Sequence, residues 1–484
     1  MYQFGAGPAG CSVANHLSEN PAVKVLLLEV GKAEIVPAQD IPGGFLFQTA
    51  TDYNYAYLSE PQSKGCLGLI NQQCAFHHGR GLGGSTIINN MIYTRGNWRD
   101  FDAWNASGNP GWSYRDVLPY FISAENANLR DFQNNGYHGK NGYLSVEDIP
   151  YRTPLASTFV QSGLRAGLPY IDYNSAFGSA KLLMLSGVGP KKHLRDLGIK
   201  LIKDLPVGET LYEHPGVIGP VFLVTQPIDN NINFESTLTL PNMIKYLFGQ
   251  GPFTSAFSEA VGYIKTPVSP YPDSDWPDVE LIQTGLQLGD DITPAGQNYF
   301  RVNDEILNSY FRPLFNTRAF MYVPLLMHSR TKGSIKLKST NPFDHPLFNY
   351  TFFDDDRDLQ ALVYGIKEAI RITGQKPFID IGVEQYTRKL PGCEQFEFNS
   401  DEYWRCYAQT LTVNFYHYVG TCKMGPESDP TTVVDARLRV HGVHKLRVVD
   451  IGIVPRAPSA HTAAVAYMIG DKGADMIKED NDLQ

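Results

Sequence analysis

The feature that most constrains the fold is a glycine-rich turn at the start of the chain. It has the pattern G-x-G-x-x-G, formed by Gly5, Gly7, Pro8, Ala9 and Gly10. The first glycine allows a tight turn, the second lets the backbone approach a pyrophosphate, and the third lets a helix pack closely on a strand. Glu29 follows 19 residues after the last glycine, at the end of the apolar run Val23–Glu29, where a carboxylate can bind a ribose hydroxyl. The turn predicts a βαβ unit that binds a dinucleotide, and it does not distinguish FAD from NAD.

The length and composition are those of a globular protein with room for two domains. The chain has 484 residues, of which 43% are hydrophobic and 19% charged, and its net charge is -9. A nucleic-acid partner would require basic patches, which this charge does not favour. No stretch approaches the roughly 18 consecutive apolar residues of a membrane span.

Four of the six cysteines form two pairs that are close in sequence, Cys66 with Cys74 and Cys393 with Cys406. Such pairs suit local disulfides in a secreted protein, and four unrelated buried thiols are the alternative. Neither pair has the short Cys-x2–4-Cys spacing of a structural zinc site, so no metal is expected. The basic start and apolar run of a secretory signal are absent. The protein is therefore either cytoplasmic, or secreted with its first exon missing from this sequence.

Secondary-structure signals change along the chain. Short strand-like runs between proline- and glycine-containing turns, such as Val221–Val224, Val279–Gln283 and Gly333–Leu337, predict an antiparallel sheet with surrounding helices. A strand at Lys445–Val449 and a helix at Ala463–Ile477 indicate a return to α/β structure at the end.

Several motifs resemble the glucose–methanol–choline (GMC) family of FAD-dependent oxidoreductases. They are the segments Gly79–Asn97, Ser175–Gly189, Asp204–Glu209 with His214-Pro215, Gly333–Leu337 with Asn341-Pro342, and His417–Gly425. The similarity touches nearly the whole chain. It is strongest to insect members of the glucose dehydrogenase-like, ecdysone oxidase-like and salicyl alcohol oxidase-like groups.

The resemblance implies an α/β fold, α+β overall, with a Rossmann-like FAD-binding domain that is discontinuous in sequence and a substrate domain with an antiparallel sheet and flanking helices. Residues 1–219 would form the N-terminal module, mostly FAD-binding. Residues 220–404 would form mainly the substrate-binding domain, and residues 405–484 would return to the FAD domain with the catalytic histidines.

The resemblance also implies the site residues. Those expected to bind FAD are Gly5, Gly7, Pro8, Ala9, Gly10, Glu29, Arg80, Gly83, Gly84, Ser85, Asn89, Asp450, Thr462 and Ala463. Ile88 stands where some family members carry a histidine that links covalently to FAD, so non-covalent FAD is expected. His417 corresponds to the catalytic base of the family, and His461, 44 residues later, corresponds to its second catalytic position.

These histidines suit the oxidation of a small alcohol. A neutral imidazole can accept the hydroxyl proton at neutral pH, and the flavin N5 would accept the hydride. The electron acceptor would be oxygen or a quinone. Tyr416 and Tyr418 flank the base and are either core aromatics or the lining of a pocket for an aromatic or hydrophobic alcohol. A hydroxynitrile lyase on the same fold is an alternative function.

The sequence departs from the family pattern at one place. Asn174 runs directly into Ser175, where several dozen residues normally intervene, including a strand of the nucleotide-binding sheet. Loss of an interior strand would expose backbone polar groups. A splice form, an imperfect gene model or a catalytically impaired paralogue would each produce this gap, which places FAD binding in question.

Overall fold

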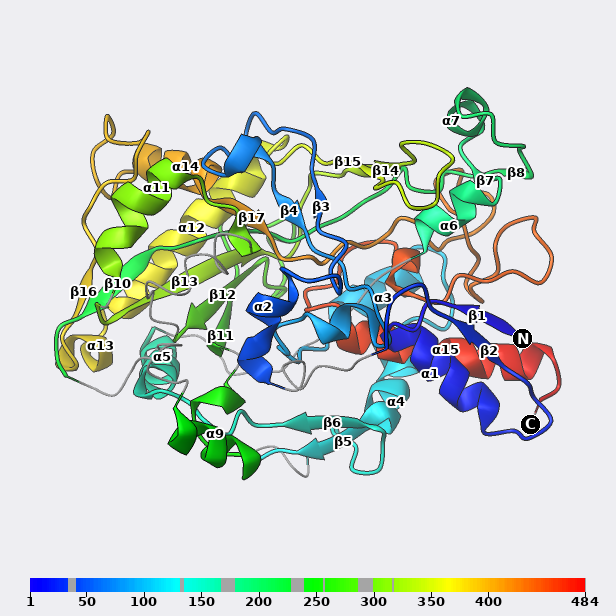
Figure 1. Cartoon of the computed structure of the whole chain (residues 1–484), viewed down its shortest axis with the longest axis horizontal. Helices are drawn as coiled ribbons and strands as arrows, with labels where there is room; N and C mark the ends of the chain where they lie inside the picture. Colours follow the sequence, from blue (N-terminus) through cyan, green and yellow to red (C-terminus); the bar gives the residue numbers. More distant parts are fainter. Residues whose placement is uncertain are drawn as a thin grey trace.

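The structure is a computed structural model, and it describes the chain in eight stretches. These are residues 1–33, 41–130, 135–166, 179–227, 239–255, 257–285, 299–315 and 317–483. The junction between Asn174 and Ser175 lies outside the described residues. Two lobes are visible in Figure 1, one built on a large sheet and the other on the two ends of the chain.

The larger lobe contains an antiparallel sheet of seven strands within the described residues. The main path runs in the order β11 (Ser258–Ile264), β12 (Val279–Thr284), β13 (Ala319–Leu326), β10 (Val221–Val224) and β16 (Val383–Gln385). Strand β9 (Pro215–Val217) pairs with both β13 and β17 (Thr412–Asn414). All eight residues of β13 are buried, as expected for a continuous apolar run at the centre of a sheet. The antiparallel sheet predicted from the sequence is confirmed for Val221–Val224 and Val279–Gln283. The run Gly333–Leu337 instead contributes to a separate antiparallel pair, in which Ser334–Lys336 lies beside Leu347–Asn349.

Helices cover this sheet. The long helix α12 (Asp356–Thr373) packs on β12 and β13, and α14 (Asp401–Thr410) packs on α12. Helix α5 (Pro154–Arg165) packs on β11 and on α13 (Lys376–Asp380).

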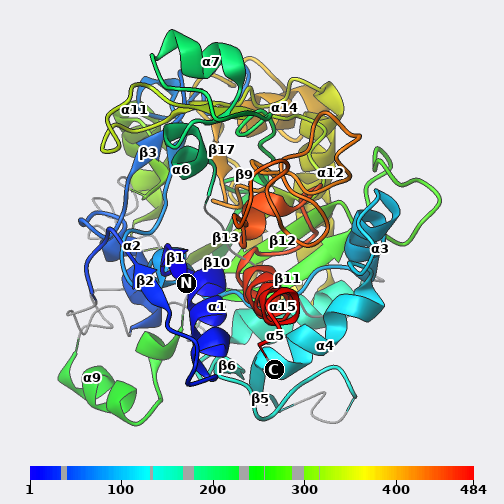
Figure 2. The same ribbon diagram turned by 90° about the vertical axis from the view of Figure 1, so that its right-hand side faces the viewer.

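The second lobe joins the first and last segments of the chain. Strands β1 (Tyr2–Phe4) and β2 (Leu26–Leu28) pair in parallel, with helix α1 (Pro8–Ser18) between them in sequence. Helix α1 packs against the C-terminal helix α15 (Ala463–Asp480), and Figure 2 shows the two helices side by side. The α1 helix begins at Pro8, because proline is favoured in the first helical turn.

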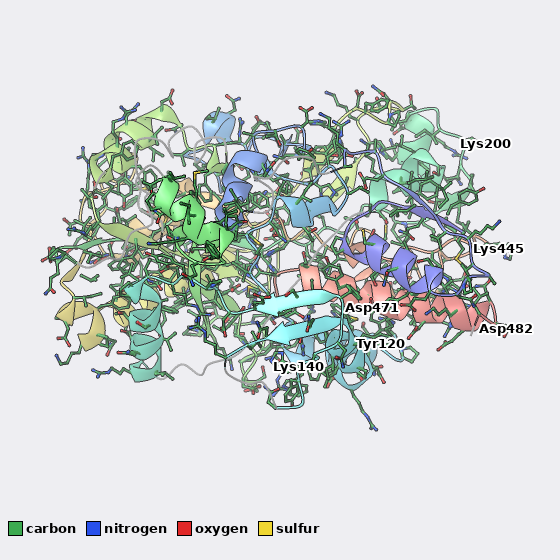
Figure 3. All side chains as sticks on the ribbon, turned by 60° about the horizontal axis from the view of Figure 1, so that its bottom comes forward. Tyr120, Lys140, Lys200, Lys445, Asp471 and Asp482 are labelled. Carbon is green, nitrogen blue, oxygen red and sulfur yellow. A yellow bond between two sulfur atoms is a disulfide. The ribbon has the colours of Figure 1, made fainter. Side chains whose placement is uncertain are left out.

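A close approach and a buried carboxylate hold α1 on α15. A Cβ atom at Gly470 would lie 2.7 Å from the carbonyl oxygen of Ala9, so glycine is required at this crossing. Asp471, labelled in Figure 3, is buried and accepts hydrogen bonds from Ser12 Oγ of α1 and from Tyr143 Oη, the latter at 2.5 Å. The two ends of the chain are thus joined by both packing and hydrogen bonds.

One face of the β1–β2 pair is uncovered. Tyr2, Phe4, Leu26 and Leu28 lie on the same face and are 75%, 57%, 50% and 39% exposed. Parallel sheets are normally buried on both faces. A second parallel pair, β7 (Val188–Gly189) with β8 (Lys203–Asp204), is not joined to it in the part of the chain that the structure describes.

Two expectations about strands need correction. The run Val23–Glu29 was expected to be one strand, but only the three residues of β2 pair with a neighbour. The strand expected at Lys445–Val449 is wrong, because this segment is a loop with a single bridge between Arg439 and Arg447. Alternating apolar residues indicate a strand only where a partner strand is available.

The remaining elements are shorter or lie around the two lobes. They are η2 (Pro42–Gly44), α2 (Phe45–Gln48), β3 (Tyr57–Leu58), η3 (Ile70–Gln72), β4 (Ala75–Phe76), η4 (Gly84–Ile87), α3 (Trp98–Ala106), α4 (Tyr114–Ala124), β5 (Glu125–Asn128), β6 (Leu144–Glu147), α6 (Ala180–Leu185), α7 (Lys191–Asp196), α9 (Leu240–Leu247), η5 (Pro252–Thr254), α11 (Asp304–Ile306), η6 (Leu307–Phe311), η7 (Arg312–Leu314), β14 (Ser334–Lys336), β15 (Leu347–Asn349) and η8 (Ile451–Ile453). Among the described residues, no helix combines the length and apolar character needed to cross a membrane.

Both predicted disulfides are present. Cys66 is bonded to Cys74 and Cys393 to Cys406, with Cα–Cα distances of 5.8 Å in each case. The second disulfide connects the loop before α14 to the helix itself, closing a segment of 13 residues. Cys11 and Cys422 are free thiols.

We expect removal of the Cys393–Cys406 disulfide to destabilise the protein. The variant with both Cys393→Ser and Cys406→Ser should lose about 3 kcal/mol of unfolding free energy, because the bond restricts the unfolded chain over a loop of this length. Guanidinium unfolding monitored by tryptophan fluorescence checks this. Cys11→Ser, at a free thiol, is the control and should change the unfolding free energy by less than about 0.5 kcal/mol. A double variant that unfolds at the same denaturant concentration as the parent protein would contradict the expectation.

Candidate functional site

The three glycines of the N-terminal turn each have a distinct structural role. Gly5 has a φ of +87°, a conformation that L side chains rarely adopt. A Cβ atom at Gly10 would collide with the carbonyl oxygen of Gly5, whereas one at Gly7 would meet no atom within 4 Å. The turn therefore has no space for a side chain at Gly10. At Gly7, just before the N-terminus of α1, the backbone is accessible to a ligand.

The second glycine-rich segment packs directly on this turn. Gly83 N donates a hydrogen bond to Ala6 O at 2.7 Å. A Cβ atom at Gly84 would lie 2.8 Å from Gly7 Cα, so glycine is needed for the contact. Ser85 Oγ accepts a hydrogen bond from Gly79 N at 3.1 Å and helps to close the second segment. The structure thus brings together two motifs that lie far apart in sequence.

The polar residues expected near a nucleotide lie around these two segments. Glu29 accepts hydrogen bonds from Ala6 N at 2.9 Å and from Gly31 N at 2.7 Å, which places its carboxylate beside the turn. The Arg80 guanidinium lies 5.5 Å from the centre of the Tyr55 ring. Asn89 Oδ1 accepts a hydrogen bond from Met91 N at 3.1 Å.

Residues from the C-terminal segment complete this region. Asp450 accepts hydrogen bonds from Gly452 N at 2.7 Å and from Ser179 Oγ, and its burial raises its pKa. Thr462 stands at the N-terminal cap of α15, and Ala463 is its first helical residue. The positive end of an 18-residue helix dipole is therefore located immediately after His461.

His417 and His461 lie next to each other. Their ring centroids are 4.7 Å apart, and both side chains are buried. His417 comes from the loop that follows β17, while His461 precedes α15 and donates its backbone N–H to Thr94 Oγ1 at 3.0 Å. The two histidines selected from sequence are therefore brought together by the fold.

A carboxylate on β12 holds His461. The His461 Nε2 atom is 3.1 Å from both oxygens of Glu280, whose side chain is fully buried. Tyr263 Oη donates a further hydrogen bond to Glu280 Oε1 at 3.0 Å. Sequence reasoning missed Glu280. The sequence feature that could have indicated its role is an acidic residue inside the apolar run Val279–Thr284. A charged side chain is retained in a buried strand only when it has an oppositely charged or hydrogen-bonding partner.

A second buried pair, Glu213 and His214, holds His417. The Nδ1 atoms of His214 and His417 are 2.9 Å apart. Glu213 Oε1 accepts three backbone N–H groups, from His214, Phe415 and His417, at 2.9, 3.3 and 3.1 Å. The sequence analysis noted His214 only as part of a family motif and did not assign it a role.

Burial shifts the titration of this cluster. It raises the pKa of Glu213 to about 8 and lowers the pKa of His214 to about 3. Burial, together with the neighbouring His461 and His214, also lowers the pKa of His417 well below its ordinary value. Desolvation disfavours the charged form of each group, so the imidazoles of His214 and His417 are neutral at physiological pH.

The two tyrosines that flank His417 lie in different surroundings. Tyr416 has a φ of +62°, and its ring lies near His77 and Tyr299, with centroids 4.8 and 5.5 Å away. Tyr418 is buried and stacks on Phe76, with centroids 4.7 Å apart and an interplanar angle of 9°.

In the described residues, no group of three histidine, cysteine or acidic side chains is arranged to hold a metal ion.

Comparison with known proteins identifies the family. Models of the GMC oxidoreductase family match residues 55–176 and 329–470. Glucose dehydrogenase [FAD, quinone] of Drosophila pseudoobscura pseudoobscura is 32% identical, with 98% of this chain and 86% of that protein aligned. Alcohol dehydrogenase [acceptor] of Pseudomonas putida is 27% identical, with 100% and 97% aligned.

The insect alignment extends over 560 residues, although this chain has only 484. The insect protein therefore has residues within the aligned region that this chain lacks. A crystal structure of formate oxidase shares the fold, with a TM-score of 0.83, 22% identity and coverage of 100% of this chain and 98% of that one. The α/β fold class expected from the sequence is confirmed, and the chain belongs to the GMC oxidoreductase family.

Proposed function

We propose that this protein is an FAD-dependent oxidoreductase that oxidises the CH–OH group of a small alcohol, with His417 as the base and His461 as its partner. The observation that carries the proposal is the contact between the buried imidazoles of His417 and His461 at the N-terminus of α15. The relatives named as glucose, choline and alcohol dehydrogenases support the substrate class.

The glycine turns fit the pyrophosphate of FAD. Gly7 opens onto free space at the start of α1, where backbone N–H groups and the helix dipole favour an anion. The Glu29 carboxylate beside the turn suits a ribose hydroxyl. Ile88 has no nucleophile, which supports non-covalent binding. Bound FAD supplies the oxidising group, a flavin whose N5 accepts a hydride.

The proposed role of each protein group follows from its surroundings. His417 is neutral and can accept the hydroxyl proton of the alcohol. Glu280 orients His461, and its carboxylate stabilises positive charge on that ring. The N-terminus of α15 favours negative charge in front of it, where the reduced cofactor would lie. Tyr416 is the stronger candidate for contact with substrate, because Tyr418 packs in the core.

The names of the relatives support a proposal for the electron acceptor, and the disulfides support one for the cellular location. The relatives include a dehydrogenase named for a quinone and an oxygen-dependent choline dehydrogenase, so we propose oxygen or a quinone as the acceptor. The two disulfides suit an oxidising compartment and support a secreted protein.

A second candidate function is that of a catalytically impaired member of the family. The uncovered apolar face of β1 and β2 favours it, because the strands that carry the glycine turn lack the cover that a parallel sheet normally has. In that case the cluster around His417 would be intact while FAD would bind weakly or not at all.

An absorption spectrum before and after addition of aromatic and aliphatic alcohols tests the main proposal. We expect a flavin band near its usual position that bleaches with one of the alcohols. His417→Ala should slow bleaching by about 10²- to 10⁴-fold, the contribution of a general base. His441→Ala, at a buried histidine outside the cluster, is the matched control and should bleach like the parent protein. A colourless protein that cannot be reconstituted with FAD would instead support the impaired member.

The pH dependence of bleaching should reflect the lowered pKa of His417. Because this base is neutral well below pH 6.5, the bleaching rate should stay constant within about twofold between pH 7.5 and 6.5 and fall only in more acidic solution. His214, His461 and Glu213 face the base, and Glu213 loses its proton near pH 8, so the range stops below that value. Stopped-flow absorbance measures the rate. A loss of rate already at pH 7 would contradict the assignment of His417 as the base.

Glu280→Gln should reduce the bleaching rate by about tenfold, or ~1.4 kcal/mol of barrier, because the amide can orient His461 but carries no charge. Glu280→Asp, which keeps the charge on a shorter side chain, is the comparison variant. Circular dichroism shows whether both variants fold. Equal rates in the parent protein and Glu280→Gln would show that the carboxylate has no electrostatic role.

A further inference from the structure

The contact between His214 and His417 requires an assignment of protons. The two Nδ1 atoms are 2.9 Å apart, and the rings are nearly perpendicular, with an interplanar angle of 80°. At this distance one Nδ1 must carry the hydrogen and the other must accept it. The contact therefore fixes the tautomer of both rings.

The proposed role of His417 indicates which ring donates. The His214 side chain is fully buried, and burial lowers its pKa to about 3, so the neutral ring has a single N–H group. A neutral His417 can accept a proton only at a ring nitrogen that carries no hydrogen, and its Nδ1 atom is in contact with His214. The accepting nitrogen is then Nε2, so the shared hydrogen is on Nδ1 of His417 and Nδ1 of His214 accepts it.

The backbone around the two rings is held by a common group. Strands β9 and β17 pair with Asn414 opposite Pro215, which sets His214 and the loop containing His417 side by side. Glu213 then binds the backbone N–H groups of both histidines through one oxygen. The distance between the rings is thus determined by strand register and by one buried carboxylate, before any substrate is present.

We infer that His214 is a positioning residue that holds His417 in the tautomer with hydrogen on Nδ1, so that Nε2 of His417 is the nitrogen that accepts the alcohol proton. The inference rests on the proposed function for the identity of that proton. The same function decides which of the two rings carries the shared hydrogen, whereas the contact itself rests on the distance between the two Nδ1 atoms.

Nitrogen-15 NMR of the cofactor-free protein tests the tautomer directly. Long-range proton–nitrogen spectra of protein labelled on histidine nitrogen distinguish protonated from unprotonated ring nitrogens, and the loss of signals in His417→Gln identifies the ring. We expect Nδ1 of His417 to be protonated and Nε2 to be unprotonated. The opposite pattern would overturn the inference whether or not the protein oxidises alcohols.

Two variants of similar polarity separate a hydrogen-bonding role from a packing role. His214→Asn places an amide oxygen near the former Nδ1 position, whereas His214→Gln places its polar atoms near the former Nε2 position. We expect the Asn variant to keep the His417 tautomer and to bleach within about threefold of the parent rate. The Gln variant should lose the tautomer, and its limiting bleaching rate should fall at least tenfold while KM changes less than twofold.

His441→Gln is the matched control, since His441 is also buried but bonds to Thr432 and Gly425 away from the cluster. It should leave both readouts unchanged. Equal impairment of His214→Asn and His214→Gln, or an unchanged tautomer in His214→Gln, would overturn the positioning role. The expected tautomer in a protein that no alcohol bleaches would refute the proposed function and leave the assignment of His214 standing.

Discussion

The contact between α1 and α15 is the constraint on which the candidate site depends. It brings the first helix of the chain against the last one, at a crossing where Gly470 lies too close to Ala9 for any side chain. The glycine turn precedes one helix, and His461 precedes the other. A candidate site built from residues more than 450 positions apart therefore forms only when both ends of the chain are folded. A stable N-terminal or C-terminal segment on its own would not form the site.

The second determinant of the site is the antiparallel sheet. Strand β12 supplies Glu280, and the pairing of β9 with β17 sets His214 beside His417. Each imidazole of the pair formed by His417 and His461 is thus held by a group from a different segment. Two loops, which would be mobile alone, receive their geometry from strand register and buried hydrogen bonds, as a site with defined proton positions requires.

Much of this organisation could be predicted from sequence, and the rest could not for physical reasons. The glycine turn, His417 and His461 belong to local patterns, so their spacing was informative. Glu280 and His214 matter because of what lies across from them in space, and no local pattern encodes that. The strand expected at Lys445–Val449 failed for the same reason, since apolar alternation does not reveal whether a pairing partner exists. The short β2 strand likewise depends on its neighbours.

The two-stranded β1–β2 sheet has a thermodynamic consequence for any ligand of the glycine turn. Two strands of three residues with an exposed apolar face form a unit that can open at lower free energy than the whole protein. A ligand that binds only the closed form has its dissociation constant increased by the inverse of the closed fraction. A nucleotide added in excess would then shift this local equilibrium toward the closed form by mass action. Its binding would therefore stabilise the folded β1–β2 unit of the second lobe.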